Sequence, residues 1–126
     1  MIGNGGYAGE NLESPQRTTL RDDAIRAGFA FTQTNTAHDA SDRPLGSFAT
    51  DPQQLIDYAF RGVHVTAETA KRIAAAYYGT APARSYFVGC STGGRQGLVS
   101  AQRFPQDFDG ILAGASVLDF VGTMVS

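Results

Sequence analysis

The chain has 126 residues, a formal net charge of −2 at pH 7 and 42% hydrophobic residues. This length allows one domain with a modest core, and the composition is that of a globular chain rather than a disordered one. The slight negative charge, with scattered basic residues, argues against a nucleic-acid partner, and no stretch is long enough for a membrane span.

Four glycines within residues 1–9 indicate a loop whose backbone approaches another group closely. The pattern Gly3-x-Gly5-x-x-Ala8 loosely fits a dinucleotide-binding turn, but such a turn needs a strand before it and a helix directly after it. We favour an oxyanion loop, which lends one backbone N–H to a developing negative charge. A flexible terminal tail is the third, non-functional interpretation.

The next elements are a helix, a strand and a loop. Thr18 or Thr19 could cap a helix that runs to about Ala27, with Gly28 as its stop. Residues 29–34 are rich in strand-forming residues, and the polar residues 35–50 indicate a loop. This loop contains His38, which we expect to anchor the loop by hydrogen bonds rather than to act as a general base.

Asp51 followed by Pro52 is a strong helix start, and apolar residues recur at helical spacing up to Tyr78. A bend is expected at Gly62. His64 lies within this long helix and is interpreted as a packed or solvated residue. A strand at 85–88, a helix closed by Pro105 and a strand at 110–115 follow. Strands that alternate with helices predict an α/β fold with a parallel sheet flanked by helices.

The strand at 85–88 leads into Gly89-Cys90-Ser91-Thr92-Gly93, a Gly-x-Ser-x-Gly sequence. Strand, sharp turn and helix in this order are the context of a nucleophile elbow, in which glycines make room for a strained serine. The free N–H groups at the start of the following helix favour negative charge at the same place. An ordinary glycine-rich turn with a solvent-facing Ser91 is the non-catalytic alternative.

The segments 89–97 and 102–111 closely resemble the tannase and feruloyl esterase family, and the likeness extends over nearly the whole chain. Residues 3–9 resemble the family's oxyanion loop, and 61–66 one of its helical segments. Cys90, directly before the serine, is the most specific feature. The resemblance implies an α/β-hydrolase core in which Ser91 is the nucleophile of a Ser-Asp-His triad. It also implies an oxyanion hole formed by the backbone N–H of Thr92 and that of Gly5 or Gly6.

The family further implies a disulfide from Cys90 to a cysteine that follows the triad histidine, and an inserted lid domain that often binds calcium. Substrates are small esters of aromatic acids, of the feruloyl or galloyl type. Members are typically secreted, so an extracellular or periplasmic parent protein is expected, although Met1 and Ile2 show no signal peptide. No cofactor is expected in this segment, neither nucleic acid nor membrane is expected as a partner, and the oligomeric state is left open.

The chain lacks positions that match the family's acid and its His-Cys pair. Asp119 does not match the family acid, and the histidine that His38 resembles is not the triad base. We therefore interpret residues 1–126 as a partial α/β-hydrolase catalytic domain, from the oxyanion loop to the strand after the nucleophile. Cys90 is the single cysteine and excludes an internal disulfide. The alternatives are a nucleotide-binding α/β module and a non-catalytic fragment or interaction module.

Overall fold

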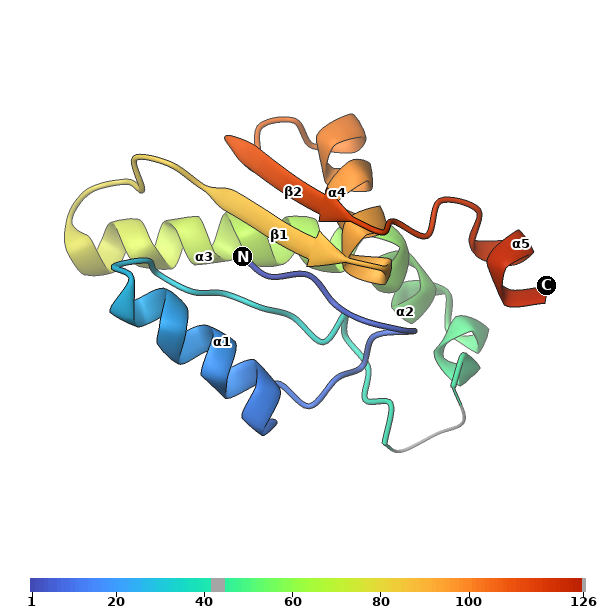
Figure 1. Cartoon of the computed structure of the whole chain (residues 1–126). Helices are drawn as coiled ribbons and strands as arrows, with labels where there is room; N and C mark the ends of the chain where they lie inside the picture. Colours follow the sequence, from blue (N-terminus) through green and yellow to red (C-terminus); the bar gives the residue numbers. More distant parts are fainter. Residues whose placement is uncertain (42–44, 126) are drawn as a thin grey trace.

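The computed structural model describes residues 1–41 and 45–125 (Figure 1). Helices and strands alternate from residue 62 onward, as the sequence predicts for that part, whereas the elements described before residue 62 are all helices. In order, the elements are α1 (Pro15–Arg26), the 3-10 helix η1 (Ser47–Thr50), α2 (Pro52–Ile56), the π-helix η2 (Asp57–Arg61), α3 (Gly62–Tyr78), β1 (Tyr86–Cys90), α4 (Thr92–Arg103), β2 (Gly110–Gly114) and α5 (Phe120–Val125).

The sheet consists of β1 and β2, which are parallel and in register from Tyr86 opposite Gly110 to Cys90 opposite Gly114. The N-terminal segment lies on the other side of β1, where Ile2 forms a parallel bridge with Val88. The predicted α/β fold with a parallel sheet is therefore confirmed. The strand predicted at residues 29–34 is wrong: this segment is irregular backbone, which is tied to the N-terminal segment by the N–H of Ile2 donating to the carbonyl of Thr32 and by the side chain of Asn4 donating to the carbonyl of Thr34.

Helix α4 packs against both strands, and α3 packs against α4 (Figure 1). The side chain of Phe87 points to this covered face and is 1% exposed. Because successive strand residues point to opposite faces, Tyr86 and Val88 lie on the other face, where both are exposed. Leu112, the register partner of Val88, is exposed there as well.

The helix boundaries follow local capping chemistry. Asp51 caps α2 as predicted, and its carboxylate accepts hydrogen bonds from the backbone N–H groups of Gln53 and Gln54. The predicted helix to Tyr78 is confirmed in extent, although η2 widens one turn before Gly62. Helix α1 begins at Pro15, earlier than predicted, because proline suits the first helical position. The hydroxyl of Thr19 instead donates back to the carbonyl of Pro15.

Within the described residues, no helix combines the length and apolar character needed to cross a membrane.

Candidate active site

Ser91 occupies the junction between β1 and α4 and has φ 58° and ψ −118°. Residues other than glycine rarely adopt this backbone conformation, and holding a residue in it costs on the order of 1–3 kcal/mol. The junction is fixed on both sides, because the N–H of Ser91 donates to the carbonyl of Gly114 and its own carbonyl accepts from the N–H of Arg95. The local geometry is that of a nucleophile elbow, as the Gly-x-Ser-x-Gly sequence predicts.

Gly89 and Gly93 are required by close approach at this turn. A Cβ on Gly89 would overlap the carbonyl group of Gly93 and lie 2.8 Å from its Cα. A Cβ on Gly93 would lie 2.9 Å from the carbonyl oxygen of Asn4. The second contact brings the glycine-rich N-terminal loop against the first turn of α4.

Two further bonds join this loop to α4. The hydroxyl of Thr92 donates to the carbonyl oxygen of Gly6 at 2.5 Å, and the N–H of Asn4 donates to Oε1 of Gln96 at 3.0 Å. Gly6 has φ +49°, in the left-handed region that glycine favours. The predicted oxyanion loop and the predicted nucleophile are therefore neighbours, although they are more than 80 residues apart in the sequence.

The structure distinguishes the three predicted backbone donors. The N–H of Gly5 donates to Oε1 of Glu10 at 2.7 Å, so this donor is already engaged. The N–H groups of the first turn of a helix have no partner within the helix, and Thr92 is the first residue of α4. Thr92 and Gly6 thus remain as the pair of donors that could face an oxyanion.

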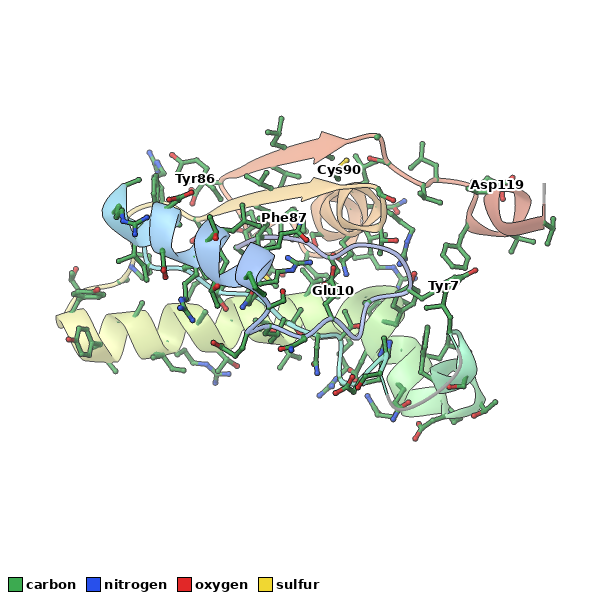
Figure 2. The ribbon with its side chains drawn as sticks, turned by 60° about the horizontal axis from the view of Figure 1, so that its bottom comes forward. Tyr7, Glu10, Tyr86, Phe87, Cys90 and Asp119 are labelled. Atoms are coloured by element: carbon green, nitrogen blue, oxygen red, sulfur yellow. The ribbon has the colours of Figure 1, made fainter. Side chains whose placement is uncertain are left out.

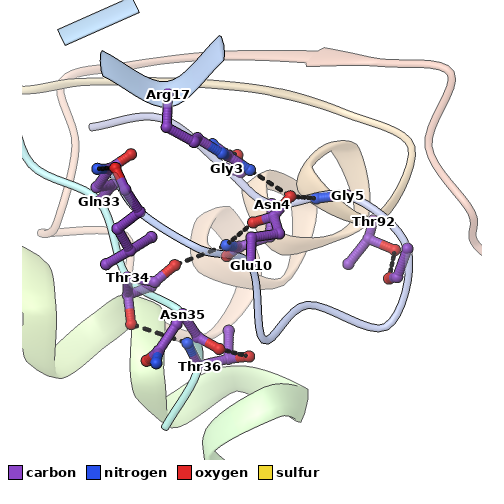
Figure 3. A network of polar contacts seen from close by, with 12 residues as sticks. Gly3, Asn4, Gly5, Glu10, Arg17, Gln33, Thr34, Asn35, Thr36 and Thr92 are labelled. Atoms are coloured by element: carbon purple, nitrogen blue, oxygen red, sulfur yellow. Dashed lines mark hydrogen bonds and ion pairs between the residues drawn. The ribbon is translucent and has the colours of Figure 1, made fainter. Parts of the chain in front are cut away.

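A network of polar side chains holds the glycine-rich loop in place, and it was not predicted from the sequence (Figure 3). The side chain of Asn4 donates to Glu10 and to the carbonyl of Thr34, and accepts from the side-chain amide of Gln96. Arg17 forms an ion pair with Glu10 and donates to the carbonyl of Gly3 at 2.9 Å. Asn4, Arg17 and Gln96 are buried, which requires such partners. In the sequence, the one indication of this network is that Asn4 and Gln96 lie among glycines.

Both histidines of the sequence are engaged with groups other than Ser91. Nε2 of His38 donates to the carbonyl of Tyr7 at 3.0 Å, and its ring stacks on Phe48, as expected for a residue that anchors the loop. In the same loop, Ser41 donates its backbone N–H and its hydroxyl to Asp39 and so lowers the pKa of that carboxyl.

His64 pairs with the buried Asp107, with Nδ1 and Oδ2 2.9 Å apart, and its ring stacks on Phe104. Asp107 follows the end of α4, whereas Ser91 precedes its start. A helix of 12 residues is roughly 18 Å long, so the pair is remote from the elbow. His64 is packed, as the sequence predicts, and it joins α3 to the loop after α4.

The model of the family described as tannase and feruloyl esterase matches residues 1–126. The chain belongs to this family. Feruloyl esterase B of Aspergillus niger is 40% identical over 119 residues, which are 94% of this chain and 22% of that protein. The probable feruloyl esterase B-1 of Aspergillus terreus is 40% identical over 113 residues, which are 90% of this chain and 20% of that protein. The chain thus spans about a fifth of the length of these curated relatives.

The crystal structure of feruloyl esterase B from Aspergillus oryzae superimposes with a TM-score of 0.79 at 36% identity. The match covers 94% of this chain and 22% of that structure. A second crystal structure, of an esterase from the same organism, gives a TM-score of 0.75 at 35% identity. The predicted membership in a family of carboxylic ester hydrolases, and the predicted partial α/β-hydrolase fold, are confirmed.

The structure also shows the surroundings of Cys90 and Asp119, which were discussed with the family resemblance. Cys90 is a free, exposed thiol at the end of β1 (Figure 2). Asp119 precedes α5, where its carboxylate accepts from the N–H of Gly122 at 2.8 Å and its carbonyl accepts from Thr123. Asp119 therefore caps α5.

The alternative of a dinucleotide-binding turn has no structural support at the N-terminal glycines. Such a turn leads directly into a helix, whose N-terminus binds the pyrophosphate. In this family member, residues 3–14 form turns and irregular backbone before α1 begins at Pro15. The glycines instead contact the first turn of α4.

Proposed function

We propose that this chain is the central part of a serine carboxylic-ester hydrolase that acts on esters of aromatic acids, of the feruloyl or galloyl type. The longer protein that would contain it is called the parent protein below. The observation that carries the proposal is the strained backbone of Ser91 at the junction of β1 and α4, with the glycine-rich loop beside it. The names of the relatives, feruloyl esterase B and B-1, support the substrate class.

In the proposed reaction, the hydroxyl of Ser91 attacks the ester carbonyl carbon while a general base takes its proton. The carbonyl oxygen becomes an oxyanion, which the N–H groups of Thr92 and Gly6 stabilise. The tetrahedral intermediate expels the alcohol, which receives the proton from the base, and leaves an acyl-enzyme on Ser91. Water, activated by the same base, then releases the aromatic acid and restores the serine.

The base and its acid partner would come from parts of the parent protein outside this chain, because His38 and His64 are engaged elsewhere. We therefore expect the isolated chain to be inactive or very weak, since the oxyanion hole and substrate binding alone supply only a small residual rate. The same outside part would contribute a disulfide partner for Cys90 and a lid with bound calcium. We also propose that the parent protein is secreted.

The test is hydrolysis of a feruloyl ester by the parent protein and its Ser91→Ala variant. We expect the variant to lose activity by several orders of magnitude, because no nucleophile remains for the acyl-enzyme. Ser85→Ala is the matched control, since Ser85 lies at the opposite end of β1 and should leave the rate unchanged. Undiminished turnover by Ser91→Ala would contradict the proposal.

A further inference from the structure

We propose that Glu10 is a positioning residue for the oxyanion hole, which it keeps in place by fixing the glycine-rich loop. The inference rests on the proposed function and concerns the same site. Glu10 lies outside the Gly-x-Ser-x-Gly sequence and outside the glycine run, and Figure 2 shows it on the loop near α1. Its role would be indirect, through the backbone of Asn4, Gly5 and Gly6.

The carboxylate of Glu10 accepts from three donors on two elements. Oε1 accepts from the N–H of Gly5 at 2.7 Å and pairs with the guanidinium of Arg17 on α1. Oε2 accepts from the side-chain amide of Asn4 at 2.5 Å. Charge-assisted bonds of this kind are stronger than neutral ones, and the Glu10 side chain is 27% exposed, which limits their screening.

These bonds fix one end of the segment that carries Gly6. Asn4 is bonded to Gln96 through both its backbone N–H and its side-chain oxygen, so the position of Asn4 is tied to α4. Glu10 holds Asn4 and Gly5 together from the other side. Beyond Gly5, the carbonyl of Gly6 is fixed by Thr92 and by the hydroxyl of Tyr58 at 3.3 Å.

As a consequence, the N–H groups proposed to bind the oxyanion are already in position before substrate binds. The N–H of Gly5 is bound to Glu10 and the carbonyl of Gly6 is bound to Thr92, so the two peptides that flank the Gly5–Gly6 peptide are fixed, and the carbonyl of Gly5 accepts from the N–H of Ala8 at 2.9 Å. The N–H of Gly6 belongs to this peptide. Oxyanion stabilisation depends on donors that need no reorganisation during the reaction, so loosening this peptide should weaken it.

Glu10→Gln removes this function while keeping the shape of the side chain. Glutamine offers a single acceptor oxygen where three donors converge, and its NH₂ group must face one of them. It also leaves the buried guanidinium of Arg17 without its anion. Glu13→Gln is the matched control, because Glu13 is three residues away, its side chain is 75% exposed and it pairs with the surface residue Arg21 at 3.3 Å.

The experiment compares an aryl ester with its thionoester, in which sulfur replaces the carbonyl oxygen, on the parent protein and both variants. Sulfur accepts hydrogen bonds poorly, so an intact oxyanion hole favours the oxygen ester strongly. We expect Glu10→Gln to lower kcat for the oxygen ester on the order of 10- to 100-fold with a smaller change in KM. The preference for oxygen over sulfur should fall by a similar factor.

Rates are expressed per active site, counted by complete fluorophosphonate labelling, so that a partly unfolded variant does not imitate the effect. Glu10→Asp, which keeps the charge, should recover part of the oxygen preference and replaces Glu10→Gln if the latter does not fold. An unchanged oxygen-to-sulfur ratio in the Glu10 variants would overturn the inference, even if kcat falls. If Ser91→Ala retains turnover, the proposed function itself fails, which is a separate result.

Discussion

At the scale of single residues, a short sequence pattern predicts some of the contacts on which the site depends, but not all of them. The Gly-x-Ser-x-Gly spacing was sufficient to predict the elbow, because the strain of Ser91 and the space around Gly89 and Gly93 are local properties. Glu10 and Gln96 could not be predicted in the same way. Gln96 bonds to Asn4 across 92 positions of sequence, and no local periodicity specifies such a partner.

A residue-scale prediction concerns the space at the elbow. Gly89→Ala should destabilise the parent protein by about 1–3 kcal/mol or more, because its Cβ would overlap the carbonyl of Gly93. Gly114→Ala is the control: it lies on the neighbouring strand, and its Cβ would meet only the carbonyl oxygen of Gly89 at 3.9 Å. Urea unfolding measures both. Equal stability of the two variants would show that the elbow is not tightly packed.

At the scale of secondary structure, most elements were predictable, and the failures have physical causes. The helix to Tyr78 and the strands at Tyr86–Cys90 and Gly110–Gly114 follow from periodicity and from β-forming residues. Residues 29–34 have strand-like composition but lack a strand ladder, because pairing depends on neighbours that composition does not reveal. The early start of α1 shows that Pro15 outweighs the threonine caps.

A prediction about stability compares the N-cap residues of α2 and α1. Asp51→Ala should lower the free energy of unfolding by about 0.5–2 kcal/mol, because the carboxylate accepts from the N–H groups of Gln53 and Gln54. Ser14→Ala should have a much smaller effect, because the Ser14 side chain makes no capping hydrogen bond at the start of α1. Chemical unfolding of the two variants provides the comparison, and an equal or larger loss for Ser14→Ala would contradict it.

At the scale of the whole molecule, the face of the sheet opposite α4 is apolar and open. Tyr86, Val88 and Leu112 are 48%, 46% and 66% exposed, which is unusual for the strands of a parallel sheet, whose faces are normally covered. The fold class followed from the order of helices and strands. Which face of the sheet stays open could not be predicted, because it depends on where the helices pack.

This face leads to a prediction about the isolated chain. Exposed apolar strand residues favour association, so the 126-residue chain should form dimers or larger species as its concentration rises. A chain carrying Val88→Lys and Leu112→Lys should remain monomeric to higher concentration, which sedimentation can measure. If both chains are monomeric over the same range, the open face does not drive association.

We propose that Ser91 is the nucleophile of an esterase whose base lies outside this chain. The most direct measurement is fluorophosphonate labelling of the parent protein and of the isolated chain, followed by mass spectrometry of the modified peptide. We expect a stoichiometric adduct on Ser91 of the parent protein and little or none on the isolated chain. An adduct on another residue of the parent protein, or rapid labelling of the isolated chain at Ser91, would contradict it.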